Sequence, residues 1–185
     1  MTTTETTAVP AAEPAFVQSF DEPESSGRKL AIICSKGNLD MAYPGLILAN
    51  AALGEGVEVH MFFTFWGFDM INKQTAGDLK FSYLGNTAMH PPGRFGVSMP
   101  QGLAGMPGMT SVTTKMMKKQ IADLDVPDVP EFLELIHESG GHLWACRMSA
   151  DMMKLDDADL VESVEGIISA SDFIELTEGA QLLFI

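Results

Sequence analysis

The sequence predicts an α/β protein, with a doubly wound, flavodoxin-like parallel sheet of about five strands and helices on both faces. Two observations lead to this class. Short apolar runs alternate along the chain with longer segments of helical pattern, and the first two runs are separated by one helix, as in a βαβ unit. The first run is continuously apolar, as is typical of strands buried on both faces. Right-handed crossovers between such strands place helices on both sides of the sheet.

Each element follows from its own local pattern. The first strand, residues 30–34, stops at Lys36 and Gly37, and a helix runs from Asp40 to about Leu53, where Gly54 and Gly56 end it. Further along the chain we predict a strand at 57–65, an amphipathic helix at 115–124, a helix at 129–138, a strand at 142–146, mostly helix at 149–164, and strands at 166–170 and 182–185.

Two segments fall outside this alternation. Residues 1–28 are rich in Thr, Ala, Pro, Ser and Glu and show no sustained apolar period, so we expect a disordered acidic tail before a single domain at 29–185. Residues 72–112 are rich in Gly, Pro and Met. A loop of this length inside a compact domain is usually functional or an interface.

Composition narrows the classes of function. The net charge of -14 repels phosphate backbones and anionic bilayers, so we expect no nucleic-acid partner. The longest apolar stretch, 61–68, is far shorter than the ~20 residues of a spanning helix, and we predict no membrane span. The N-terminus shows no signal-peptide pattern, so we expect a cytoplasmic protein whose two cysteines are free thiols.

Those two cysteines are the candidate chemical groups. Cys34 and Cys146 each close an apolar run of strand type, the position where open α/β sheets carry their reactive groups. Arg147 and a helix opening near Ser149 would lower the pKa of Cys146. In the flavodoxin-like order the first and third strands are neighbours, so the two thiols could exchange sulfur or form a disulfide. The alternative is that both are buried structural thiols.

Other chemistries have weaker support. No two histidines have i, i+4 spacing, and His60 reads as a satisfied, partly buried strand residue. The methionines of the insert suit packing or an interface better than copper, and no glycine motif for nucleotides is present. We therefore expect neither a metal nor a cofactor, although the fold class would permit a flavin.

Four stretches together carry a family resemblance, at residues 29–45, 59–67, 146–153 and 167–173. The chain over 29–185 resembles the DsrE/DsrF-like family, in particular its stand-alone DsrE-type proteins. The resemblance implies a cytoplasmic sulfur carrier in which Cys146, the first residue of a Cys-x-x-Ser motif, bears the persulfide. It also implies homo- or hetero-oligomers that exchange sulfur with TusA-type carriers and rhodaneses. Cys34 is not part of that motif.

The function expected from these observations is that of a sulfurtransferase-like carrier. The Cys146 thiolate would accept sulfane sulfur or a thiosulfonate and relay it to a partner protein, with Cys34 as a second candidate. Lys36, Arg147, Arg94 and Ser149 are candidates for binding the anionic adduct. The apolar 66–68 run and the Met-rich insert predict a homo-oligomer, a trimer or tetramer. The alternative is a non-covalent ligand-binding or scaffold protein.

Overall fold

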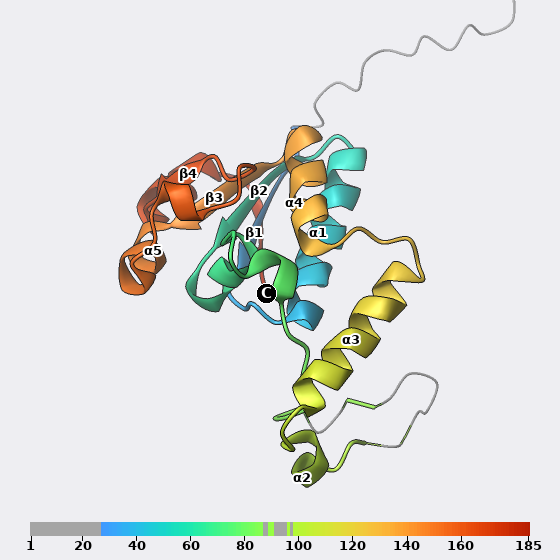
Figure 1. The fold of residues 1–185 in the computed structure, drawn as a ribbon. Helices are drawn as coiled ribbons and strands as arrows, with labels where there is room; N and C mark the ends of the chain where they lie inside the picture. The colour runs from blue at the N-terminus through green and yellow to red at the C-terminus, as the bar shows by residue number, and fades with distance from the viewer. Residues whose placement is uncertain (1–26, 87–88, 91–95, 97) are drawn as a thin grey trace, which may run out of the picture.

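The computed structural model describes residues 27–86, 89–90, 96 and 98–185. Five strands form one sheet in the order β4-β3-β2-β1-β5, and every neighbouring pair is parallel (Figure 1). The predicted α/β class and the five parallel strands are confirmed. The strands are β1 (Lys29–Cys34), β2 (Glu58–Phe63), β3 (His142–Cys146), β4 (Gly166–Ile168) and β5 (Gln181–Phe184).

The strand order differs from the one expected. β2 lies between β1 and β3, so the first and third strands are not neighbours. Helices α1 (Leu39–Gly54) and α4 (Val129–Glu138) pack side by side on the same face of the sheet (Figure 1). Because parallel crossovers are right-handed, two successive crossovers on one face move the chain in the same direction. This places β3 beyond β2 rather than beside β1.

Helix α6 (Ala170–Leu176) covers part of the opposite face. Its Phe173 stacks on Phe62 of β2, with ring centroids 4.5 Å apart. Phe62 and the next residue, Phe63, face opposite sides of the sheet. From this face the chain returns to form β5 beside β1. The predicted strand at 166–170 was too long, because Ser169 caps α6 in a capping box with Asp172.

The remaining helical segments are shorter or differently placed than predicted. The expected helix over 149–164 is only α5 (Arg147–Met153), which ends at Lys154 in the left-handed conformation. The predicted helix at 115–124 begins earlier and forms α3 (Met109–Ala122). The other segments are the 3₁₀ helices η1 (Phe65–Met70), η2 (Ala76–Asp78) and η3 (Asp157–Asp159) and the short helix α2 (Gln101–Ala104).

The described part of the 72–112 insert therefore contains η2, α2 and the first residues of α3. Two predictions lie outside the described residues: the character of the tail, except for Gly27 and Arg28, and the place of Arg94.

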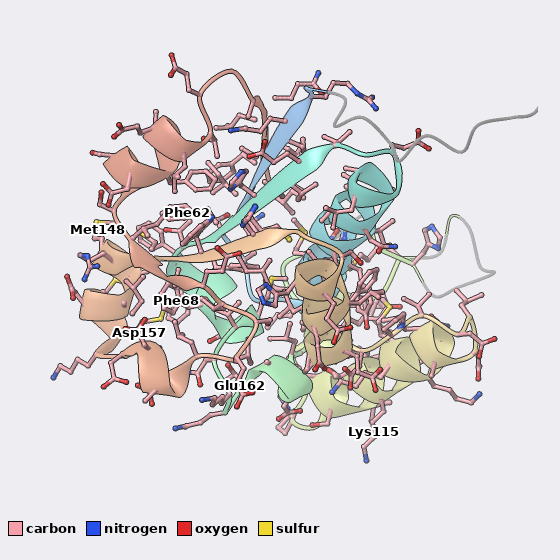
Figure 2. All side chains as sticks on the ribbon, turned by 90° about the horizontal axis from the view of Figure 1, so that it is seen from above. Phe62, Phe68, Lys115, Met148, Asp157 and Glu162 are labelled. Carbon is pink, nitrogen blue, oxygen red and sulfur yellow. The ribbon has the colours of Figure 1, made fainter. Side chains whose placement is uncertain are left out.

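The hydrophobic core fills the space between the sheet and its helices. Ile32, Met61, Phe63 and Leu143 are fully buried on neighbouring strands, whereas Lys115 lies at the edge of the molecule (Figure 2). In the part of the chain that the structure describes, no helix is both long and apolar enough to cross a membrane.

Candidate functional site

Cys146 lies at the carboxyl end of β3 and is the N-cap residue of α5. Only 4% of its surface is exposed, yet it lines an open hollow of about 360 Å³ on the protein surface. The other residues of this hollow, here called the Cys146 hollow, are Arg147, Met148, Asp151, Ser169 and Ala170. The small exposed part of this residue therefore borders an open hollow.

Two hydroxyl groups meet at the thiol. Ser149 is fully buried on α5, and Thr64 follows β2, the strand next to β3. Their oxygens lie 3.2 Å apart and hydrogen-bond to each other, and both hydroxyls act to lower the pKa of the Cys146 thiol. The backbone N–H of Phe65 donates to the Ser149 oxygen at 2.8 Å. Phe65 has a φ of 47°, a left-handed conformation that is uncommon for an aromatic residue.

These groups set the acidity of the thiol. Burial raises the pKa of Cys146, but the hydrogen bonds from the Ser149 N–H, the Thr64 and Ser149 hydroxyls and the Met148 N–H lower it, and the net direction is down. Because the thiolate is the nucleophilic form, this environment favours reaction at neutral pH.

The residue expected to lower this pKa was Arg147. In the structure its guanidinium donates to the carbonyl of Ile167 at 2.6 Å. The backbone N–H groups of the helix opening, predicted together with Arg147, do act on the sulfur, and two hydroxyls join them. Sequence reasoning did not single out Thr64. It could be found only from the strand order, because the end of β2 meets the end of β3 once these strands are neighbours.

Cys34 has a different environment. It is buried in the core with its sulfur facing Gly45 of α1, and burial raises the pKa of its thiol to about 12. It is therefore protonated at neutral pH. This environment is that of a structural thiol, the alternative that the sequence left open.

The expected meeting of the two thiols does not occur. Cys34 aligns with Phe63, and Phe63 with Ala145, so Cys146 points to the opposite face of the sheet. Two strand spacings also separate the two ends by about 10 Å. A disulfide requires Cα atoms within about 7 Å, so these cysteines cannot form one within the chain.

Only some of the residues predicted to bind the adduct lie near Cys146. Arg147 lines the Cys146 hollow and Ser149 acts on the thiol, while the binding of an adduct by either residue stays a prediction. Lys36 is exposed after β1, is not among the residues lining the hollow, and its charge acts on Asp40.

His60 is satisfied, as predicted, and it is buried rather than partly buried. Its Nε2 lies 2.7 Å from Glu58, and its Nδ1 accepts from the Trp144 ring N–H at 3.3 Å. Within the described ranges, no group of three or more His, Cys, Asp or Glu side chains is arranged to hold a metal ion.

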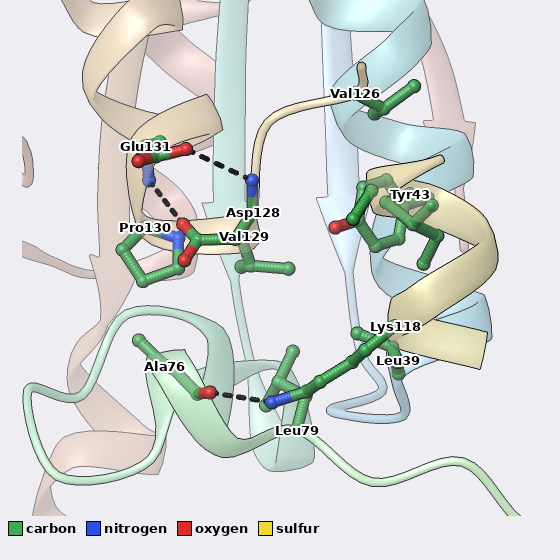
Figure 3. A pocket seen from close by; sticks show the side chains of 13 residues that line it. Leu39, Tyr43, Ala76, Leu79, Lys118, Val126, Asp128, Val129, Pro130 and Glu131 are labelled. Atoms are coloured by element: carbon green, nitrogen blue, oxygen red, sulfur yellow. Dashed lines mark hydrogen bonds between the residues drawn. The ribbon is translucent and has the colours of Figure 1, made fainter. Parts of the chain in front are cut away.

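A second hollow of about 330 Å³ lies between α1, α3 and α4 and contains neither thiol (Figure 3). Its polar groups have structural partners. The Tyr43 hydroxyl donates to the carbonyl of Pro127, Lys118 donates to the carbonyl of Gly77, and Asp128 and Glu131 form the capping box of α4.

Fold and site together define a parallel α/β protein with one activated cysteine at the carboxyl edge of its sheet. The sequence model of the DsrE/DsrF/DrsH-like family matches residues 26–184, and the chain belongs to this family.

A curated relative is the sulfur carrier protein DsrE2 of Allochromatium vinosum, 37% identical over 159 residues that cover 85% of this chain and 98% of that protein. The uncharacterized protein YrkE of Bacillus subtilis is 29% identical over 163 residues, with coverage of 85% and 97%. Among solved structures, the protein of unknown function MTH1491 from Methanobacterium thermoautotrophicum is similar with a TM-score of 0.52 and 10% identity, covering 85% of this chain and 99% of that one. This structural likeness supports the fold.

Proposed function

We propose that this protein is a sulfur carrier that accepts sulfane sulfur on Cys146 and passes it to a partner protein. The observation that carries the proposal is the environment of Cys146, a thiol with a lowered pKa held by two hydroxyls and open to a surface hollow. The similarity to a relative named as a sulfur carrier supports it.

The proposed chemistry needs no change in the total oxidation state. The Cys146 thiolate attacks the outer sulfur of a donor persulfide, a sulfur–sulfur bond forms, and the donor leaves as a thiolate. With tetrathionate the same attack would leave a thiosulfonate on Cys146 and release thiosulfate. Onward transfer repeats the exchange, with the acceptor thiolate as nucleophile and Cys146 as leaving group.

Partners must approach the Cys146 hollow. The hollow exposes a large apolar side chain, because Met148 is 60% exposed on α5. Such a surface suits a protein partner better than a small solute. The TusA-type carrier, the rhodanese, the cytoplasmic location and the trimer or tetramer remain predictions, the last testable by light scattering.

The test is sulfur loading of the full chain followed by intact-mass spectrometry. After exposure to polysulfide, the wild type should gain the mass of sulfur atoms and lose it again to a reducing thiol. Cys146→Ser should fold but gain nothing, because a hydroxyl cannot form a persulfide, while Cys34→Ser should load like the wild type. Loading of Cys146→Ser, or no loading of the wild type, would favour the non-covalent scaffold function.

A further inference from the structure

We infer that the site stabilises negative charge on the inner sulfur of a Cys146 persulfide and not on the outer one, with Thr64 as a positioning residue for sulfur release. This inference rests on the proposed function and specifies that the site favours the release of sulfur. Cys146 would give sulfur away readily rather than store it.

The inner sulfur is surrounded by hydrogen-bond donors. The Ser149 oxygen accepts the Phe65 N–H at 2.8 Å and lies 3.2 Å from the Thr64 oxygen, a hydrogen bond in which either hydroxyl can donate. The two hydroxyls share two hydrogens, so the hydroxyl that does not donate to the other can direct its hydrogen at Cys146. The Thr64 hydroxyl reaches the same sulfur from β2, and the Thr64 N–H is fixed on the carbonyl of Cys34 at 3.0 Å. These donors are in place before any sulfur binds, so they stabilise the charge that returns to the inner sulfur during release.

The outer sulfur would extend into the Cys146 hollow, whose lining is different. Met148 and Ala170 are apolar, and Asp151 adds a negative charge that disfavours a second anion. The Ser169 oxygen already accepts the Asp172 N–H at 3.1 Å. Arg147 is held on the Ile167 carbonyl, and its charge also acts on Asp172. Arg147 and Asp151 thus bring one charge of each sign to the hollow, whereas the donors gather at the inner sulfur. We therefore take the transferred sulfur as the neutral S–SH form, whose outer sulfur is electrophilic.

The release step then balances without any further reagent. An acceptor thiolate attacks the outer sulfur, its new sulfur–sulfur bond forms as the Cys146 bond breaks, and the electron pair stays on Cys146. The outer sulfur keeps its proton and leaves with the acceptor. Since exchange is faster when the leaving thiol is more acidic, donors at the inner sulfur accelerate release and shift the equilibrium toward the acceptor.

The experiment compares Thr64→Val with Thr64→Ser in the full chain loaded by polysulfide, with glutathione as acceptor. Thr64→Val removes the hydroxyl at nearly equal size, whereas Thr64→Ser keeps it. We expect Thr64→Val to release sulfur about tenfold more slowly, the scale of one hydrogen bond to a charged group. Its persulfide should also be more populated at equilibrium, and its alkylation profile should move to higher pH. Thr64→Ser should behave like the wild type.

Loading rates are corrected for the thiolate fraction given by the alkylation profile, so that acceptance and release are separated. If Thr64→Val loads and releases at wild-type rates, the inference is wrong while the proposed function stands. If the wild type does not load, the proposed function itself fails. Should Thr64→Val not fold, Ser149→Ala tests the same donors, and an unchanged release rate in that variant overturns the inference.

Discussion

Gly67 lets η1 pack closely against β1, and this packing also positions Thr64 near Cys146. It lies in η1, where a Cβ atom would stand 2.1 Å from the carbonyl oxygen of Cys34 and 2.8 Å from its carbonyl carbon. An ordinary contact begins near 3.4 Å, so Gly67→Ala must push η1 and β1 apart by about 1.3 Å. Both groups are backbone and cannot rotate away. We expect a loss of about 1 to 3 kcal/mol in the free energy of unfolding, as for overpacked cores.

The same displacement should reach the thiol. The Cys34 carbonyl also accepts the Thr64 N–H, so moving η1 moves the residue that donates to Cys146. Urea unfolding should give the stability loss, and iodoacetamide alkylation between pH 5 and 10 should give a higher pKa for Cys146. Gly77→Ala is the matched control, because open space surrounds its Cβ position. A Gly67→Ala variant with the stability and alkylation profile of the wild type would refute this reasoning.

Two further predictions concern titration. Burial raises the folded-state pKa of Cys34 from 9.0 to about 12, so its contribution to stability is complete below pH 9 and is lost as the pH rises toward 12. Alkaline unfolding should therefore be less steep with pH for Cys34→Ala than for the wild type, and equal slopes would contradict the buried thiol. Burial is also the largest influence on His60 and lowers its pKa despite the nearby Glu58. The folded state then binds fewer protons, so stability should fall as the pH drops below about 6.5, the pKa of a free histidine. His60→Phe should remove that part of the slope in acid unfolding curves, and a slope unchanged by the substitution would argue against it.

The class of fold was predictable because its signals are local. The apolar run before Cys34 and the helical pattern of 129–138 each act within a few residues, and both elements appear where they were predicted. The order of the strands was not predictable in this way. It depends on which face each helix covers, and α6 was missed because its seven residues follow directly on β4.

The same difference between local signals and strand order applies to the candidate site. Cys146 and Ser149 are close in sequence, so their meeting at the start of α5 could be expected. Thr64 joins them only because β2 is the neighbour of β3, a contact between residues 85 positions apart. Lys36 is predicted from its charge alone, and since β2 lies between β1 and β3 it does not line the hollow at Cys146.

The separation of the two thiols by β2 has a consequence under oxidative stress. A cysteine oxidised to a sulfenic acid is usually rescued by a second thiol that closes a disulfide with it. Cys34 faces the other side of the sheet, and the chain has no third cysteine. Peroxide damage at Cys146 can therefore be reversed only by a thiol from outside the chain. Without one, the acidic thiol that suits Cys146 to sulfur exchange exposes it to irreversible oxidation to the sulfinic acid.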